Sequence, residues 1–324
     1  MTYEPPYTLN TSIFSLLEQV NQEIGMLKGL KVEFSTPKLR KQNSIKTIQA
    51  SLAIEGNTLS LSQVTALFEG KRVLGPQKEI IEVQNAINVY DHLNRLDPLS
   101  PKDFLKAHGI LMNQLDLDAG AWRKEAVGIF KQDQIRHLPP PADKVPHQME
   151  DLFIYLQENE HPWLIKACVF HYELEFIHPF MDGNGRMGRL WQQRIAMNSS
   201  LIFGFISVEE CIKNSIDDYY KILSICDSAG DSTKFIVYSL EQILLALKQF
   251  SNDSTKLDTA EKRLSFAEQK NIVFQFLRRD YQYIHPDIST ATASRDLVWG
   301  VENGILEKSG FKNQTRYCFK KRSG

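Results

Sequence analysis

The residues best suited to chemistry lie together at positions 178–189, whose sequence is His-Pro-Phe-Met-Asp-Gly-Asn-Gly-Arg-Met-Gly-Arg. An imidazole such as His178 can accept a proton near neutral pH, and the Asp182 carboxylate is a hard oxygen ligand of the kind that Mg²⁺ prefers. The Gly-Asn-Gly turn after Asp182 lets backbone N–H groups converge on an anion. Arg186 and Arg189 are three residues apart, so on a helix they share a face and can grip one polyphosphate. The segment therefore predicts nucleotide chemistry.

These twelve residues resemble the signature of the Fic family, H-x-F-x-[DE]-G-N-G-R-x-x-R, at every fixed position. The resemblance implies a protein adenylyltransferase, which moves AMP from ATP to a Ser, Thr or Tyr hydroxyl of a protein. It implies His178 as the general base and Asp182 as the ligand of Mg²⁺ or Mn²⁺. It implies that the ATP phosphates bind to Gly183, Asn184, Gly185, Arg186 and Arg189.

The finer details of this assignment also follow the resemblance. Asn184 is expected to donate an amide N–H to the α-phosphate, and Arg186 to hold the β- and γ-phosphates. Arg189 corresponds to the family arginine that reaches the γ-phosphate or an inhibitory glutamate. Phe180 is expected to be a buried structural anchor. His171, two helical turns before His178, is expected to be an ordinary helix histidine with no catalytic role.

A second segment, Ser-Leu-Ala-Ile-Glu-Gly-Asn at 51–57, resembles the family's inhibitory motif, [ST]-x-x-x-E-[GN]. Ser51 and Glu55 are four residues apart and face the same side of a helix, which Gly56 is suited to end. A glutamate is disfavoured at this end of the helix dipole, which indicates a cationic partner, and Arg189 is the expected one. An exposed glutamate beside a helix end is the alternative. The same glutamate could orient a water that removes AMP.

Helix-period apolar patterns dominate as far as about residue 250. The strongest helix predictions are 77–96, 100–112 with Ser100 as its cap, 146–157, 162–177 and the stretch after the signature to about Met197. Residues 127–141 alternate apolar and polar groups, and resemblance makes them a flap hairpin whose edge docks the protein target. We expect a mainly α protein with a Fic-type helical core, this short hairpin and a small C-terminal winged-helix domain.

The expected domains are an N-terminal helical region (1–98), a catalytic core (99–250), a polar linker (251–263) and a winged-helix-like domain (264–324). In the last of these, Ile272, Val273, Phe276 and Leu277 are expected to form a helix face, and Arg316–Phe319 a strand. From residue 264 onward the sequence has 10 Lys and Arg against 6 Asp and Glu, a net charge of +4.

This basic C-terminal region supports an alternative function, a DNA-binding transcriptional regulator with a recognition helix at Ser294–Gly304. A winged helix used for protein contacts is equally open. We expect Leu297 and Trp299 to face the core in either case.

The composition is that of an ordinary globular protein, with 324 residues, 42% of them hydrophobic and 24% charged. A net charge of −1 gives no overall attraction to nucleic acid or anionic membranes. No apolar run approaches the ~18 residues of a membrane span, and no leader is evident at the N-terminus, so we expect a cytoplasmic protein without a membrane partner. Its four scattered cysteines are expected to be reduced. Self-modification and a homo-oligomer stay open.

Overall fold

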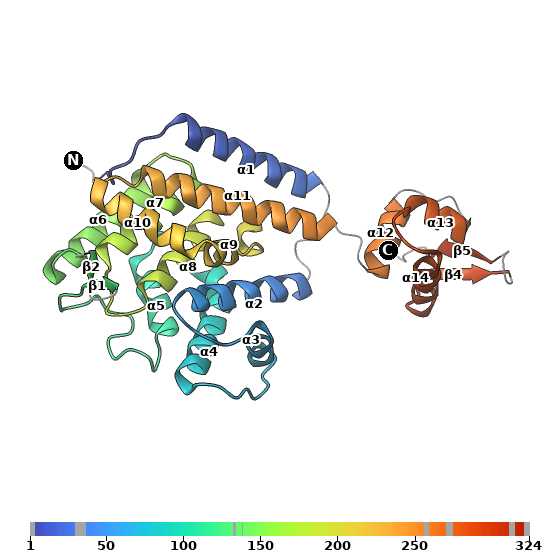
Figure 1. Cartoon of the computed structure of the whole chain (residues 1–324), viewed down its shortest axis with the longest axis horizontal. Coiled ribbons are helices and arrows are strands. Elements are labelled where there is room, and N and C mark those ends of the chain that lie inside the picture. Colours follow the sequence, from blue (N-terminus) through green and yellow to red (C-terminus); the bar gives the residue numbers. More distant parts are fainter. Residues whose placement is uncertain are drawn as a thin grey trace. The chain divides into compact units, whose positions relative to one another are not determined.

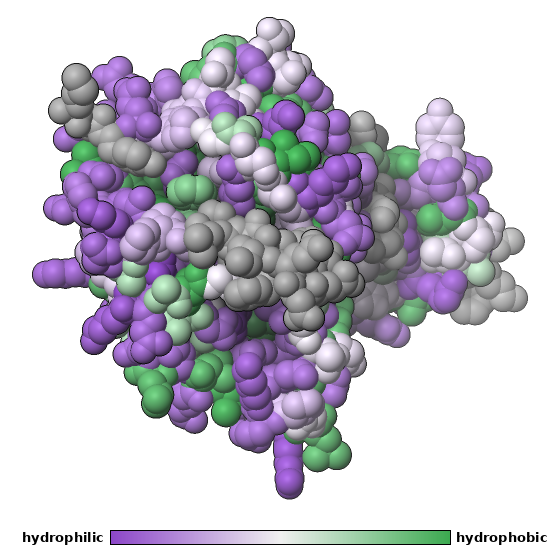
Figure 2. All heavy atoms as spheres, turned by 60° about the vertical axis from the view of Figure 1, so that its left-hand side comes forward, coloured by the Kyte–Doolittle hydropathy of each residue, from purple (hydrophilic) through white to green (hydrophobic). Residues whose placement is uncertain are grey.

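A computed structural model of the chain describes two compact units, Met1–Ser251 and Asn252–Gly324 (Figure 1). The described residues are 4–29, 37–131, 134–137, 139–255, 259–269, 275–310 and 315–320. Hydrophilic side chains dominate the face drawn in Figure 2, where hydrophobic residues are scattered in small groups. Among the described residues, no helix is both long enough and apolar enough to cross a membrane.

The larger unit is almost entirely helical (Figure 1). Its α-helices are α1 Thr11–Gly29, α2 Pro37–Ile54, α3 Leu61–Phe68, α4 Gln77–His92, α5 Pro101–Leu111, α6 Val145–Glu158, α7 Trp163–Ile177, α8 Asn184–Ala196, α9 Val208–Asn214, α10 Ile216–Ala229 and α11 Thr233–Thr255. Three 3₁₀ turns join them: η1 Leu93–Arg95, η2 Ala142–Lys144 and η3 Leu201–Gly204. The expected helix 77–96 is therefore α4 followed by the tighter turn η1.

Helix α5 begins as the sequence predicted. The Ser100 hydroxyl accepts a hydrogen bond from the backbone N–H of Asp103 at 3.2 Å, and Pro101 occupies the first turn, where its missing N–H costs nothing. The acidic side chain of Asp103 also favours the positive end of the helix dipole.

Helix α7 is the centre of the larger unit. Twelve of its 15 residues are buried, which agrees with its nearly uniform apolar sequence. Beside it, Phe104 of α5 is fully buried among Phe153, Phe170, Phe180 and Trp191, at ring-centroid distances of 5.0 to 5.8 Å. Aromatic packing of this kind fixes the loop that contains Phe180 against α5 and α7. The expectation that Phe180 is a buried anchor is confirmed.

Two antiparallel strands, β1 Ile129–Lys131 and β2 Gln134–His137, pair within the expected flap at 127–141. Residues 132, 133 and 138 lie outside the described part of the chain. Whether this hairpin docks a target stays a prediction.

The smaller unit contains α12 Ala260–Gln269, β3 Phe276–Leu277, α13 Arg278–Ile284, α14 Thr290–Glu302, β4 Leu306–Ser309 and β5 Arg316–Phe319. Its three antiparallel strands have the order β3-β5-β4. Leu297 is fully buried and Trp299 packs partly buried against the same cluster, as expected. In this core Arg263 and Asp296 form a two-point ion pair, with N–O distances of 2.6 and 2.8 Å.

One sequence prediction about this region needs correction. Phe276 and Leu277 form a strand rather than a helix face, because they pair with Tyr317 and Arg316 of β5; Ile272 and Val273 lie outside the described residues. A short apolar run does not distinguish a strand from a helix. Within the expected linker 251–263, α11 continues to Thr255 and α12 begins at Ala260; the role of this range as a linker stays a prediction.

The two units have separate hydrophobic cores, since the buried clusters of the larger unit share no residue with that of the smaller one. A chain that ends at Thr255 should therefore stay folded, with a melting temperature within a few degrees of the full chain's main transition. Circular dichroism during thermal unfolding measures this. Loss of cooperative unfolding in the shortened chain would show that the larger unit needs the smaller one.

Candidate functional site

The signature residues form the connection between α7 and α8. His178 follows the last residue of α7 in the left-handed conformation (φ 50°, ψ 61°), which is uncommon for a residue other than glycine. Pro179 prevents the helix from continuing. Gly183, at φ 86°, then turns the chain into α8, whose first residues are Asn184 and Gly185. The backbone thus presents the imidazole of His178 at one helix end and the N–H groups of α8 at the other.

Arg123 stabilises the unusual backbone at His178. Its Nε donates a hydrogen bond to the His178 carbonyl oxygen at 2.7 Å, and its backbone N–H donates to the Pro179 carbonyl oxygen at 2.9 Å. The same guanidinium also donates to the carbonyl oxygens of Glu125 and Pro140. Arg123 is 2% exposed, so these bonds are shielded from water. It acts as a positioning residue for the expected base.

Asn184 closes the loop from inside. Its amide oxygen accepts from the Phe180 N–H, and its amide nitrogen donates to the Phe180 carbonyl oxygen, both at 2.9 Å. Since Asn184 is buried, its observed role is to hold the loop. The amide nitrogen carries a second hydrogen, and its expected bond to the α-phosphate stays a prediction.

His108 of α5 contacts the loop through the face of its ring and through Nε2. Its ring stacks on Phe180 with 3.6 Å between centroids, Nδ1 accepts from the Gly120 N–H, and Nε2 donates to the Asp182 carbonyl oxygen. These partners fix the Nε2–H tautomer, because an N–H can only donate and a carbonyl oxygen can only accept. Burial lowers the pKa of His108 to about 4, so the ring is neutral at neutral pH.

Asp182 and Arg186 form an ion pair at the start of α8, with 2.8 Å between Oδ1 and Nη2. Burial alone would raise the pKa of Asp182, but the Arg186 charge and the Gly183 N–H hold it below its ordinary value. Among the described residues, the hydrogen bonds of this carboxylate all go to Oδ1. An ionised carboxylate that is 55% exposed, with Oδ2 turned to no described donor, fits a cation that also binds phosphates.

The same described residues contain no cluster of three or more His, Cys, Asp or Glu that could hold a metal ion by itself. At phosphate sites Mg²⁺ usually binds through one or two carboxylates and the substrate's own oxygens.

Arg189 lies on α8, one turn beyond Arg186, and its side chain is 1% exposed. Its guanidinium donates to the Ser51 hydroxyl at 3.2 Å, to the Ser51 carbonyl oxygen at 3.0 Å and to Glu55 Oε1 at 2.7 Å. Burial alone would lower the pKa of Arg189, but the Glu55 carboxylate raises it above its ordinary range. Its Nη1 has no hydrogen-bond partner among the described residues. The structure thus brings Ser51 and Glu55 to the signature.

Glu55 also occupies the space in front of Gly185. A Cβ added at Gly185 would overlap Glu55 Oε1 and lie 3.1 Å from Arg189 Nη1. The carboxylate therefore sits at the start of α8, where backbone N–H groups and the helix dipole attract an anion. Gly56, at φ 93°, terminates α2 just after Glu55, as the sequence predicted.

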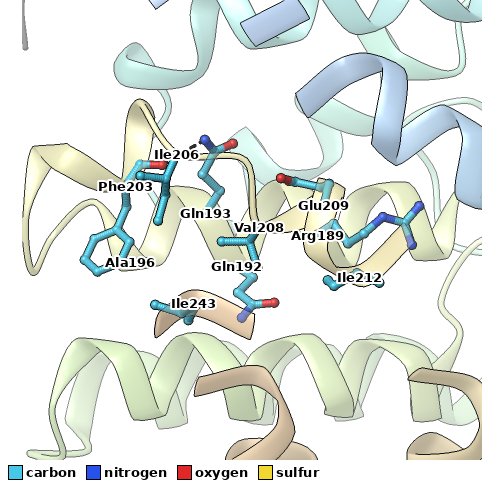
Figure 3. A pocket seen from close by; sticks show the side chains of 10 residues that line it. All are labelled: Arg189, Gln192, Gln193, Ala196, Phe203, Ile206, Val208, Glu209, Ile212 and Ile243. Carbon is cyan, nitrogen blue, oxygen red and sulfur yellow. Dashed lines mark hydrogen bonds between the residues drawn. The ribbon is translucent and has the colours of Figure 1, made fainter. Parts of the chain in front are cut away.

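A second carboxylate, that of Glu209, lies near Arg189. Glu209 of α9 is 3% exposed, and burial raises its pKa to about 7 against the opposing charge of Arg189. The Arg189 and Glu209 side chains border a cavity of about 20 Å³. Figure 3 shows that the Arg189 guanidinium points away from the Glu209 carboxylate. The cavity is too small for a nucleotide.

Sequence reasoning missed Arg123, His108 and Glu209, which act on the site from outside the signature. His171 is a buried histidine that hydrogen-bonds to Gln192 and Tyr219, as an ordinary helix histidine would. The described cysteines form no disulfide, and three of the four are buried.

Comparison with known proteins agrees with this geometry. A model of the Fic/DOC family matches residues 98–196, which include α5, α7 and α8. A protein adenylyltransferase fic-1 from Caenorhabditis elegans is 29% identical over 68% of this chain, and a protein adenylyltransferase Fic from Nematostella vectensis is 31% identical over 60%. The match spans only 44% and 46% of those two relatives.

The solved structures extend the likeness to the whole chain. A Fic family protein from Desulfovibrio desulfuricans G20 has a TM-score of 0.76 and 37% identity, over 99% of this chain and 100% of that one. The structure of C. elegans Fic-1 (residues 134–508) has a TM-score of 0.60 at 22% identity, over 75% of this chain and 71% of that one, and shows the shared fold. Because a Fic family protein aligns along its full length and the family model covers the loop that holds the site, this chain belongs to the Fic/DOC family.

Proposed function

We propose that this protein is an adenylyltransferase, which transfers AMP from ATP to a hydroxyl of a protein and is restrained by its own Glu55. The contact of Arg189 with Ser51 and Glu55 carries the proposal, since it joins the signature to the second motif that sequence reasoning singled out. Curated relatives that bear the name protein adenylyltransferase support the chemistry.

In the proposed reaction, His178 accepts the proton of a Ser, Thr or Tyr hydroxyl. The hydroxyl oxygen forms a bond to the α-phosphorus of ATP, the bond from that phosphorus to the bridging oxygen breaks, and pyrophosphate leaves. Arg186 and Arg189 hold the β- and γ-phosphates, and backbone N–H groups of Gly183, Asn184 and Gly185 face the charge that develops.

Asp182 would hold Mg²⁺ or Mn²⁺ in this account. The bound cation would neutralise charge on the phosphates, and the ionised, half-exposed carboxylate is suited to that ligand role. Arg123 and His108 contribute by fixing the backbone at His178 and Asp182.

Glu55 restrains the reaction because its carboxylate takes the place of the γ-phosphate of ATP. Its carboxylate pairs with Arg189 and fills the space in front of Gly185, so a γ-phosphate and Glu55 compete for one guanidinium. The charge of the Glu55 carboxylate would also repel a phosphate that approached Arg189. The same carboxylate could orient a water for removal of AMP.

We further propose that the protein target docks along the hairpin within 127–141, and that the protein acts in the cytoplasm, on itself among other substrates. Strand addition to the hairpin edge would recognise an extended segment through its backbone.

The smaller unit offers a second candidate function. Its order of helix, strand, two helices and two strands is that of a winged helix, and α14 presents Arg295 on its exposed side. DNA binding would depend steeply on salt, and full-length protein retained on duplex DNA at low salt only would favour this function. A winged helix that contacts proteins instead would give no salt-dependent retention on DNA.

His178→Ala should lower AMP transfer by about 10²–10⁴, because no group remains to accept the hydroxyl proton. Incubation with ATP labelled on the α-phosphate measures transfer, whereas label on the γ-phosphate should not be transferred. Calorimetry should show that the variant still binds ATP. The exposed His147, changed to alanine, is the control. Undiminished labelling by His178→Ala would remove this residue from the mechanism.

Glu55→Gly should raise AMP transfer and tighten productive ATP binding, because Arg189 then loses the carboxylate to which it is hydrogen-bonded and can bind the γ-phosphate. Arg189→Ala should show no activation, since it loses the phosphate contact as well. Initial rates of transfer of the α-phosphate label to one and the same protein acceptor measure the activity of both variants.

Glu158→Gly is the matched control for this experiment, because Glu158 also ends a helix and is exposed. Equal transfer rates for Glu55→Gly and the wild type would mean that residues 51–57 are only a capped helix end.

A further inference from the structure

The segment after Glu55 is anchored to α4. Asn57 donates through its amide nitrogen to Glu82 Oε2 at 2.8 Å and to the Glu79 carbonyl oxygen at 3.2 Å. Thr58 donates through its backbone N–H and its hydroxyl to Glu79 Oε2, at 2.6 and 2.9 Å. Two glutamates one turn apart on α4 thus receive the chain as it leaves the inhibitory motif.

One of these glutamates also reaches the signature. Glu82 Oε1 lies 3.7 Å from Arg186 Nη1, and the two side chains are 13% and 6% exposed. Asp182 occupies Nη2 of the same guanidinium at 2.8 Å. Arg186 Nε has no hydrogen-bond partner among the described residues. Arg186 therefore lies between two carboxylates and still has an N–H to offer to a further anion.

The two carboxylates act differently on Arg186. The bond to Asp182 has hydrogen-bond length and orients the guanidinium, whereas the 3.7 Å separation from Glu82 exceeds that length, so Glu82 acts through its charge. The side chains of Glu82 and Arg186 are largely shielded from water. Charge interactions are stronger in such a place than at the surface. Removal of the Glu82 charge would leave Arg186 oriented but more attractive to phosphates.

We propose that Glu82 is a second restraint on nucleotide binding, which competes with the β- and γ-phosphates for Arg186 and which Asn57 couples to the inhibitory motif. The inference rests on the proposed function, which brings those phosphates to Arg186. Residues 55–57 then act on both arginines of the signature, because Glu55 pairs with Arg189 directly and Asn57 holds the carboxylate that faces Arg186. Movement of this one segment would release both phosphate contacts together.

The test compares ATP affinity by calorimetry in protein that already contains Glu55→Gly, so that only the second restraint remains. Addition of Glu82→Gln should tighten ATP binding about fivefold to tenfold, since one carboxylate no longer competes with the phosphates. AMP, which has no β- or γ-phosphate, should bind with an affinity that changes less than about twofold. Asn57→Ala should shift ATP affinity in the same direction, because Glu82 loses the amide that holds it.

Glu79→Gln is the matched control, since it removes the same charge from the same helix, and Glu79 bonds to Thr58 rather than to an arginine. The restraint is overturned if Glu82→Gln leaves ATP binding unchanged or weaker, if AMP gains equally, or if Glu79→Gln gives the same gain. An unchanged affinity in Asn57→Ala would overturn the coupling. Because the readout is binding, it is independent of AMP transfer. A Glu55→Gly protein that binds ATP but labels nothing would contradict the proposed function alone.

Discussion

A buried guanidinium must be paired with anions, and the way Arg189 meets this requirement organises the larger unit. Its side chain is 1% exposed, and its partners Ser51 and Glu55 come from the end of α2, far away in the sequence. Without such partners, an uncompensated charge inside the protein would be strongly destabilising. The need to pair Arg189 therefore draws the end of α2 onto the start of α8. In the proposed function, the Glu55 carboxylate that pairs with Arg189 takes the place of the γ-phosphate of ATP.

The loop between α7 and α8 is held by hydrogen bonds to its own backbone carbonyl oxygens. Arg123 binds the carbonyl oxygen of His178, whose left-handed backbone needs such support. Neutral His108 binds the carbonyl oxygen of Asp182, and Asn184 closes the loop on Phe180. Each donates a hydrogen bond to a backbone carbonyl oxygen, so the loop keeps its shape around His178 and Asp182.

Much of this could be predicted from the sequence, because the deciding signals are local. Ser100 and Pro101 begin α5, and the uniform apolar pattern of α7 indicates its burial. Prediction failed where distant contacts decide: Phe276 joins a strand because Tyr317 lies beside it. Arg123 acts on His178 across 55 residues, and no spacing rule connects such a pair. The contact of Glu82 with Arg186 could not be predicted from the sequence either, since it depends on how α4 packs.

The proposed restraint requires Arg189 to hold residues 51–57 against the signature, and hydrogen exchange of the backbone amides tests this claim. Arg189→Gln removes the charge but keeps a polar side chain of similar reach. If Arg189 holds the segment, residues 51–57 should exchange faster in this variant, without nucleotide, while the amides of α7 keep the wild-type rate. Exchange at 51–57 that matches the wild type would contradict the claim, because the segment would then be held by something other than Arg189.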